Sequence, residues 1–201
     1  MLIRTFIISA YRIPTAAMMP NLLPGDFIFA NKLAYGFFGK SSPRPGDVIL
    51  FDCPKDISVR CIKRVIALPG DTVQLRKGEL IVNGVAAEYE ELKSQNFANI
   101  LGREQFLFSN EKIMSLNRDI LVRKRMDPAE DFGPEIVPEG KVFVLGDNRV
   151  KSEDSRSWGG VALESIRGKV YLIWLSLDWD KAWAEGKLPS IRTDRFFVRV
   201  R

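Results

Sequence analysis

The stretch from Ile13 to Asp26 constrains the fold more than any other part of the chain, because it holds three prolines and a glycine in fourteen residues. Proline lacks the backbone N–H that a helix interior or a central strand requires. The stretch is therefore predicted to form a rigid loop. Small residues at positions 15 to 17 allow the backbone of a ligand to come close. A plain proline-rich connection between two strands is the alternative, and this stretch alone does not exclude it.

Short runs of alternating apolar and polar residues account for much of the remaining chain, and this period is typical of β-strands. The sequence contains no internal repeat and no alternation of strands with long amphipathic helices. We therefore predict a mainly β fold with coiled antiparallel sheets or a barrel-like core. The predicted strands cover residues 5–13, 27–32, 48–51, 59–67, 72–75, 80–82, 141–145 and 170–175.

A change in composition between about residues 86 and 132 indicates a second unit, because charged residues become denser and the alternation weakens. We interpret this segment as a smaller inserted α+β lobe, with short helices near residues 90–95 and 109–116. The main β core then consists of residues 1–85 and 133–201.

The composition excludes several kinds of chemistry. The chain has no histidine, which rules out Ser-His-Asp and Cys-His catalysis and most catalytic zinc sites. A net charge of +5 is spread along the chain without a nucleic-acid-binding motif, so an anionic membrane surface explains it at least as well as nucleic acid does. Cys53 and Cys61 flank a predicted hairpin turn, where a bridge is conceivable, but we expect two unpaired, partly buried thiols.

Both ends of the chain bear on membrane contact. The first eleven residues are apolar but interrupted by Arg4, and a transmembrane helix needs about 20 apolar residues. We therefore expect no membrane-spanning helix in this chain, and interpret residues 1–10 as the remnant of an anchor or as a first strand. Near the other end, aromatic residues mixed with lysine and arginine suggest a membrane-interface surface or ordinary packing, the latter being preferred for Trp174. These aromatic residues are Trp174, Trp179, Trp183, Phe196 and Phe197.

Lys63 is the first candidate for a chemical role, because it lies in a predicted strand whose two faces are both largely apolar. Burial disfavours the charged ammonium form and lowers a lysine pKa by ~3–5 units when it is complete. A lysine that is neutral near pH 7 can act as a general base. The alternative is a lysine that reaches the rim of the sheet and stays charged.

The polar segment 146–159 is the second candidate, since it is rich in charges of both signs. Asp147, Arg149, Asp154 and Arg156 could form a cross-braced network of ion pairs that fixes the segment. Ser152 or Ser155 could offer a hydroxyl to a neighbouring amine. The alternative is a solvated loop with surface ion pairs worth ~0–1 kcal/mol each.

Four motifs together resemble bacterial type I signal peptidase, and they appear in the family's order across about residues 11–175. The first two are Pro14-Thr-Ala-Ala-Met-Met-Pro20 with Gly25-Asp26, and Pro45-Gly46-Asp47-Val48. The third is Ile62-Lys63-Arg64-Val65 with Leu68-Pro69-Gly70-Asp71, and the fourth is Gly146-Asp-Asn-Arg149 with Ser152, Asp154-Ser155-Arg156 and Trp158-Gly159. The resemblance implies a membrane-associated Ser/Lys endopeptidase that removes signal peptides from exported preproteins. It implies action on the outer, periplasmic face of the cytoplasmic membrane, with no metal and no cofactor.

The resemblance assigns roles to individual positions. Lys63 matches the general base and Ser152 the hydroxyl that orients it, while the nucleophilic serine of the family falls on Ala17. Thr15 matches the hydroxyl that forms the oxyanion hole together with the backbone N–H of residue 17. Asp147, Arg149, Asp154 and Arg156 match a supporting network. The residues that match pockets for small substrate side chains are Tyr11, Ile13, Met18, Leu22 and Cys61.

Ala17 is the departure from the family pattern that matters most, because a methyl group cannot attack a carbonyl carbon. The chain as written is therefore expected to be inactive. A deliberate Ser-to-Ala change is favoured, because Lys63, Thr15 and Ser152 are all present. The alternatives are a natural non-catalytic peptide-binding homologue and, less favoured, a self-cleaving regulator core of the LexA type, which would need a helix-turn-helix domain that the sequence does not show.

Overall fold

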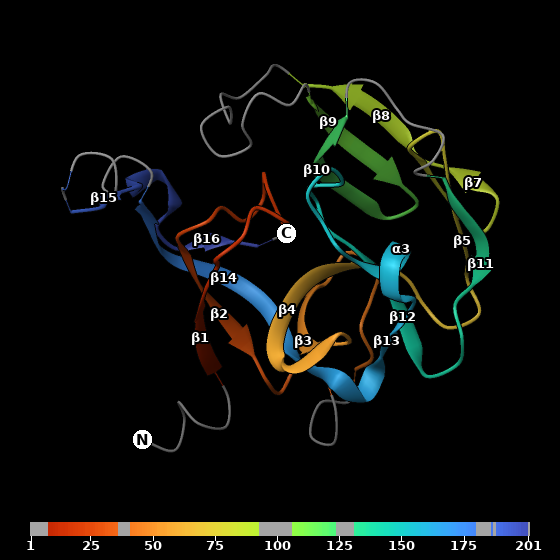
Figure 1. Ribbon diagram of the computed structural model, residues 1–201, viewed down its shortest axis with the longest axis horizontal. Helices are drawn as coiled ribbons and strands as arrows, with labels where there is room; N and C mark the ends of the chain where they lie inside the picture. Colours follow the sequence, from red (N-terminus) through yellow and green to blue (C-terminus); the bar gives the residue numbers. More distant parts are fainter. Residues whose placement is uncertain are drawn as a thin grey trace.

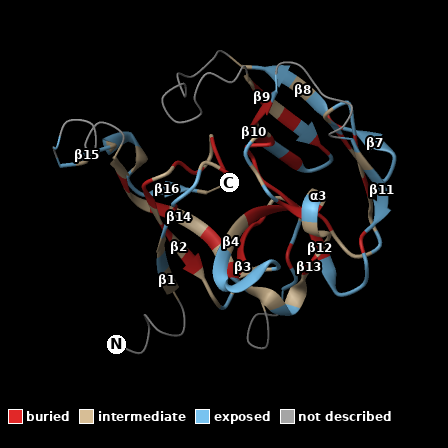
Figure 2. Ribbon diagram, in the orientation of Figure 1, coloured by how far each residue is buried: buried red, intermediate tan, exposed pale blue. Residues whose placement is uncertain are grey.

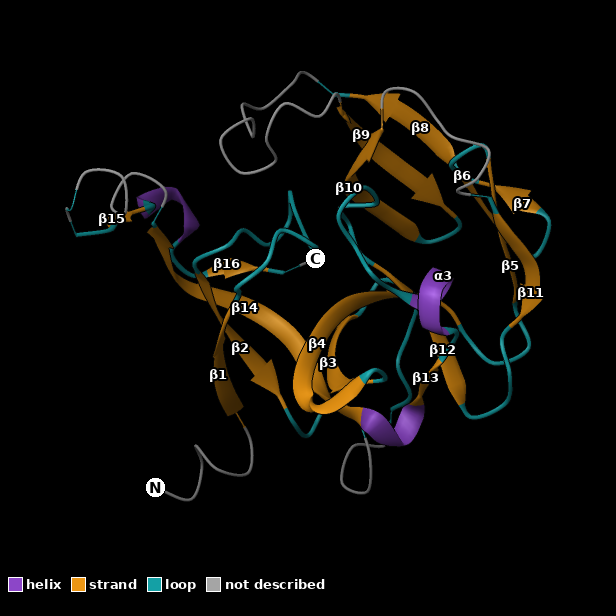
Figure 3. Cartoon of the chain, viewed as in Figure 1, coloured by secondary structure: helices purple, strands orange, loops and turns teal. Residues whose placement is uncertain are grey.

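Strands dominate the computed structural model, which describes residues 8–35, 41–92, 106–123, 131–179, 186 and 188–200. Within these residues the strands form three sheets, and every pairing between named strands is antiparallel (Figures 1 and 3). The predicted mainly β class is confirmed.

The largest sheet carries most of the predicted strands, and its order is β1-β2-β14-β3-β4-β12-β13. Two short strands, β15 and β16, also pair with β14. Its members are β1 (Ile8–Arg12), β2 (Asp26–Asn31), β3 (Val48–Cys53), β4 (Asp56–Ala67), β12 (Lys141–Leu145), β13 (Val161–Ala162), β14 (Ile166–Asp178), β15 (Ser190–Ile191) and β16 (Val198–Arg199).

The long strand β14 holds this sheet together, because one end pairs with β3 and the other with β2. Its register shifts at several points along these pairings. Gly168 lies where strands β14 and β2 come very close, since a Cβ at this position would be 2.7 Å from the Asn31 carbonyl oxygen. Only glycine fits such an approach without moving the backbone.

Two smaller sheets complete the described part of the molecule. One has the order β11-β5-β6-β7 and the other β10-β9-β8. The predicted strands at 72–75 and 80–82 are both found, and they pair as the β5–β6 hairpin, which turns at Lys77 and Gly78. The strands are β5 (Thr72–Arg76), β6 (Glu79–Val82), β7 (Val85–Ala86), β8 (Glu88–Glu91), β9 (Phe106–Ile113), β10 (Leu116–Arg123) and β11 (Phe132–Ile136).

The short helices predicted near 90–95 and 109–116 are not found in the described residues. Glu90 and Glu91 belong to β8, and residues 93–95 lie outside the described part of the chain. The prediction over 109–116 is wrong, because residues 106–123 form the β9–β10 hairpin, which turns at Met114 with a φ of 51°. Within the ranges that the structure describes, the helices are one turn each: α3 (Ser155–Trp158), η2 (Leu163–Ser165) and η3 (Thr193–Arg195).

The proline-rich loop is held against the large sheet by its own apolar side chains. Ile13, Met18 and Leu22 are buried and pack with Ile28, Leu50 and other residues of β2, β3 and β14. A second cluster fills the space between the β5–β6 hairpin, β12 and the inner end of β4. Figure 2 shows this burial in β4, whose inner end is buried while its hairpin end is exposed.

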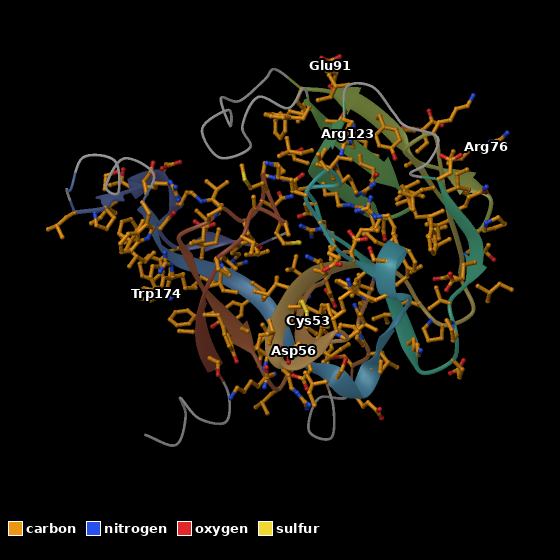
Figure 4. The ribbon with its side chains drawn as sticks, in the orientation of Figure 1. Cys53, Asp56, Arg76, Glu91, Arg123 and Trp174 are labelled. Atoms are coloured by element: carbon orange, nitrogen blue, oxygen red, sulfur yellow. A yellow bond between two sulfur atoms is a disulfide. The ribbon has the colours of Figure 1, made fainter. Side chains whose placement is uncertain are left out.

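The expectation of two free thiols is wrong, because Cys53 and Cys61 form a disulfide across the β3–β4 hairpin (Figure 4). The physical reason is the register of the hairpin. It shifts between Asp52 and Cys53, and the two cysteine Cα atoms lie 5.2 Å apart. That separation is within the range that a disulfide spans.

The region predicted to be an anchor remnant is described only in part. Residues 1–7 lie outside the described part of the chain, and β1 begins at Ile8. Among the residues that the structure describes, no helix is both long enough and apolar enough to cross a membrane.

Candidate active site

The proline-rich loop is closed at its base by two backbone hydrogen bonds. The Ile13 N–H donates to the Asp26 carbonyl at 2.8 Å, and the Gly25 N–H donates to the Ile13 carbonyl at 2.9 Å. Gly25 adopts a φ of 89°, which favours glycine. The buried Asp26 carboxylate accepts the Leu23 N–H at 2.8 Å. The loop that carries Ala17 is therefore shaped by its own backbone as well as by its prolines.

This loop and β4 border one cavity of about 290 Å³. Ala17 and Lys63 both line it and are only 8% and 6% exposed. The structure thus brings together the two positions that the family resemblance assigns to nucleophile and base. The full lining consists of Ile13, Pro14, Thr15, Ala17, Met18, Cys53, Val59, Arg60, Cys61, Ile62, Lys63, Lys151, Glu153 and Trp158.

The environment of Lys63 disfavours its charged form. Burial lowers the pKa of Lys63 below its ordinary value of 10.5, and the nearby Arg156 adds to this effect. The carboxylates of Asp154, Asp147 and Glu153 oppose it without cancelling it. Within the described residues, no hydrogen bond or ion pair reaches the Lys63 amine. A buried amine with a lowered pKa is suited to accept a proton.

The backbone at position 17 is held by Asn148. The Asn148 N–H donates to the Ala17 carbonyl at 3.1 Å, and its side-chain amide donates to the Ala16 carbonyl at the same distance. In contrast, the Ala17 N–H donates to no other residue in the described part of the chain. The exposed Thr15 hydroxyl also lacks a partner there. These two groups are the donors that the family resemblance implies for an oxyanion hole.

Ser152 approaches this region from the polar segment 146–159 but does not border the cavity. A Cβ on Gly146 would lie 2.6 Å from the Ala17 carbonyl oxygen and would overlap the Ser152 side chain. Because Gly146 has no side chain, the Ser152 side chain and the Ala17 carbonyl can both lie close to its backbone. The Ser152 hydroxyl is buried next to Asp154 and helps to lower the pKa of that carboxyl, although the two do not reach hydrogen-bond geometry.

The four charged residues predicted to brace one another pair mostly with other partners. Only Asp154 and Arg156 pair directly, with Asp154 accepting from Arg156 Nε at 2.8 Å and Nη2 at 2.9 Å. Burial raises the pKa of Asp154, but the bonds from Arg156 and the Gly146 N–H outweigh it and hold that pKa below its ordinary value. Asp147 pairs instead with Arg64, and Arg149 pairs with Glu111.

The Asp147–Arg64 pair connects the polar segment 146–159 to β4, the strand that carries Lys63. Arg64 Nε and Nη2 donate to the two oxygens of the Asp147 carboxylate at 2.8 and 2.7 Å, and both side chains are almost fully buried. The same carboxylate accepts the Asn21 side-chain amide at 2.8 Å, which ties it to the proline-rich loop. The sequence alone predicts no role for Arg64, although it lies next to Lys63 in a motif, and none for Asn21.

The predicted pocket residues divide into two groups. Ile13, Met18 and Cys61 line the cavity, whereas Tyr11 and Leu22 pack in the apolar cluster that includes Ile13 and Met18. Sequence reasoning gave no role to the charged residues that border the cavity, which are Arg60, Lys151 and Glu153. In the ranges that the structure covers, no group of three His, Cys, Asp or Glu side chains could hold a metal ion.

One edge of β4 is open beside the cavity. β4 pairs with β3 from Asp56 to Arg64, but its pairing with β12 covers only Arg64 to Ala67. Within the described residues, the stretch 57–63 therefore lacks a strand on its second side. Residues 59–63 of this stretch line the cavity. An open strand edge can accept an extended peptide as an additional strand.

The fold and this geometry define a β protein in which a buried lysine can serve as a general base beside a rigid loop. The family model described as "Signal peptidase, peptidase S26" matches residues 1–175. Signal peptidase I of Aquifex aeolicus is 34% identical, covering 94% of this chain and 80% of the relative. Signal peptidase I of Buchnera aphidicola is 31% identical, covering 96% of this chain and 77% of the relative.

The crystal structure of a signal peptidase I from Enterococcus faecalis V583 is also similar, with 31% sequence identity and a TM-score of 0.38. The match covers 64% of this chain and 97% of the Enterococcus chain. The family assignment depends on the family model and the two relatives above. The chain belongs to the signal peptidase family, peptidase S26. The resemblance stated from the motifs is thereby confirmed.

Proposed function

We propose that the chain has the site of a serine endopeptidase that removes signal peptides from exported preproteins, with Ala17 in place of the nucleophile. Membership of the signal peptidase family supports the reaction class. The observation that carries the proposal is the shared cavity of Ala17 and Lys63, in which the lysine amine is buried and unpaired among the described residues.

The first step requires a hydroxyl at position 17, as in an Ala17→Ser variant. Lys63 in its neutral form takes the hydroxyl proton while the oxygen attacks the scissile carbonyl carbon. Asp154 interacts electrostatically with Lys63, and the family resemblance assigns Ser152 to orient the lysine. The resulting oxyanion accepts hydrogen bonds from the residue 17 N–H and the Thr15 hydroxyl, each donor contributing about 2.7–4 kcal/mol.

The second half of the reaction uses the same groups. The tetrahedral intermediate collapses, the bond to the leaving amine breaks, and protonated Lys63 returns its proton to that amine. Water then attacks the acyl-enzyme with Lys63 again accepting the proton. The ester bond to the residue 17 oxygen breaks, Lys63 returns the proton to that oxygen, and the carboxyl product leaves. Neither half needs a metal ion or a cofactor.

The substrate binds as an extended strand between the proline-rich loop and the open edge of β4. Main-chain hydrogen bonds to residues 57–63 provide affinity, and the side chains of Ile13, Met18 and Ile62 form an apolar surface for small residues. This geometry fits the Ala-x-Ala pattern of signal-peptide cleavage sites.

Restoring the nucleophile tests this function. The Ala17→Ser variant is expected to cleave a preprotein with an Ala-x-Ala site, while the chain as given does not, since loss of a nucleophile costs about 10⁶ in kcat in a comparable enzyme. Lys63→Met in the Ala17→Ser background should abolish cleavage. If the restored chain stays inert while it still binds the peptide, the chain is a non-catalytic peptide-binding homologue instead.

A lipid bilayer surface is the second proposed partner, at the outer face of the cytoplasmic membrane. Its support is three exposed apolar side chains near the carboxyl end: Leu188 is 92%, Phe197 69% and Ile191 54% exposed. Arg199 is exposed in the same segment, whereas Arg192 and Arg195 pair with Asp178 and Asp26. This combination suits a boundary between apolar lipid and anionic headgroups.

A further inference from the structure

Glu111 is a buried carboxylate in β9 that the reaction described above does not use. It is 0% exposed, and its Oε1 accepts from Arg149 Nη2 at 2.7 Å and also from Arg118 Nη2. Its Oε2 accepts the Tyr89 hydroxyl at 2.8 Å. One carboxylate thus lies between two buried guanidinium groups. Breaking such an arrangement by removing one partner leaves an uncompensated buried charge.

Arg149 connects this carboxylate to the polar segment 146–159. Its N–H donates to the Leu121 carbonyl at 2.8 Å, and the Leu121 N–H donates to the Asp147 carbonyl at 2.9 Å. Residues 147–149 are therefore fixed against β10 by two backbone bonds through Leu121, and against β9 by the buried ion pair with Glu111. Asn148 lies between these attachment points.

Asn148 in turn sets the position of residue 17. Its N–H and its side-chain amide donate to the carbonyls of Ala17 and Ala16. Its Oδ1 accepts the N–H groups of Val150 and Lys151, which keeps the side chain in one orientation. The contacts form a continuous series from Glu111 through Arg149 and Asn148 to the backbone of the proline-rich loop.

We propose that Glu111 is a positioning residue for the peptidase reaction, fixing through Arg149 the Asn148 amide groups that hold residue 17 against Lys63. This inference deepens the proposed function and rests on it. The segment 86–132 then contributes to catalysis without touching the substrate. A displacement of about 1 Å between reacting groups can lower a rate by about 10²-fold, so a remote carboxylate can matter.

The test uses Glu111→Gln in the Ala17→Ser background. The variant keeps the size of the side chain and removes its charge, and kcat is expected to fall about 10- to 100-fold with KM changed less than about twofold. KM should hold because the cavity walls are unchanged. Glu90→Gln is the matched control, since Glu90 is an exposed carboxylate of β8 whose partner Lys112 is also exposed. It should leave both constants at parental values.

A double variant separates positioning from charge balance. Glu111, Arg118 and Arg149 together carry one net positive charge, and Glu111→Gln with Arg118→Gln restores that value while Arg149 still lacks its carboxylate. If Glu111 only balances charge, the double variant recovers kcat, and the proposal is overturned. If it positions Asn148 through Arg149, kcat stays low. A Glu111→Gln kcat within twofold of the parent also overturns it.

A measurement on the chain with Ala17 does not depend on catalysis. The Asn148 amide should exchange its hydrogen about tenfold faster in Glu111→Gln, because its bond to the Ala17 carbonyl opens more often. Amides of β3 should exchange as in the parent. An unchanged Asn148 rate contradicts the inference. If Ala17→Ser does not cleave, the proposed function is contradicted. The exchange rate of the Asn148 amide still tests whether Glu111 positions Asn148.

Discussion

At the scale of single residues, the buried Lys63 makes the free energy of unfolding depend on pH. Between its lowered folded-state pKa and the ordinary 10.5, the unfolded chain holds a proton that the folded chain has released, so stability rises with pH across that window. Lys63→Met removes this contribution. The variant should be more stable than the parent at pH 7, with an advantage that shrinks as the pH approaches 10.5, as measured by urea unfolding.

The control for this prediction is Lys112→Met, which changes an exposed lysine of β9. It should shift the free energy of unfolding by less than about 0.5 kcal/mol at every pH. An advantage of Lys63→Met that stays constant from pH 7 to pH 10 contradicts the prediction, because it would reflect packing alone.

The role of a residue can be predicted from the sequence when the residues that determine this role are close to it in the chain. Lys63 was identified because apolar neighbours on both strand faces indicate burial, and the structure buries it. The partners Arg64 for Asp147 and Glu111 for Arg149 are 83 and 38 residues away in sequence. No local pattern encodes such pairs. The charges within 146–159 were therefore assigned to one another, although only Asp154 and Arg156 pair.

At the scale of elements, the β3–β4 hairpin is cross-linked by Cys53 and Cys61, which are eight positions apart. Closing so short a loop in the unfolded chain gives about 2.5 kcal/mol of stability in the chain-entropy account. Cys53→Ser with Cys61→Ser should lose about that amount in urea unfolding. Reductant should lower the parent to the same level and leave the double variant unchanged; an effect of reductant on the variant would contradict this explanation.

The open edge of β4 makes a separate prediction at this scale. If an extended peptide adds to residues 57–63, their backbone amides should exchange hydrogen more slowly when a signal peptide binds the chain with Ala17. The change is expected to be about tenfold at saturating peptide. Residues 64–67 already pair with β12 and should change little. Slowing confined to the β8–β10 sheet would place the peptide elsewhere and contradict the prediction.

Strand prediction succeeded where one face of a strand is apolar and failed where charges are buried. The run at 72–75 alternates, those at 80–82 and 141–145 are short and apolar, and all three are strands. β9 contains Ser109, Asn110, Glu111 and Lys112 in a row, which masks its period. Glu111 is buried there only because Arg118 and Arg149 compensate its charge, so a tertiary contact decides the local structure.

At the scale of the whole molecule, the site depends on two parts of the chain that are far apart in sequence. The large sheet supplies Lys63 and supports the proline-rich loop, while the β8–β10 sheet supplies Glu111. The boundaries of an inserted lobe at 86 and 132 stay a prediction, but strands β8, β9 and β10 lie between them. The segment 86–132 is thus connected to the candidate active site by the hydrogen bonds between Leu121 and residues 147 and 149.

The proposed contact with a bilayer involves the carboxyl-terminal surface. Trp174 stacks on Phe29 at a ring distance of 5.6 Å, and Trp179 contacts the Arg12 guanidinium, while Trp183 lies outside the described residues. These two tryptophans therefore have partners within the protein. Phe197 is 69% exposed and is the better candidate for insertion into lipid.

A comparison of two exposed apolar residues tests this orientation. The chain should bind vesicles containing phosphatidylglycerol more tightly than vesicles of phosphatidylcholine, because its net charge is +5. Phe197→Ser should weaken binding about tenfold, since it removes apolar area worth roughly 1.5 kcal/mol or more. Ile136→Ser changes a residue of β11 that is equally exposed, at 65%, and should have no effect. Equal weakening by both variants in vesicle sedimentation would mean that lipid does not select the carboxyl-terminal surface.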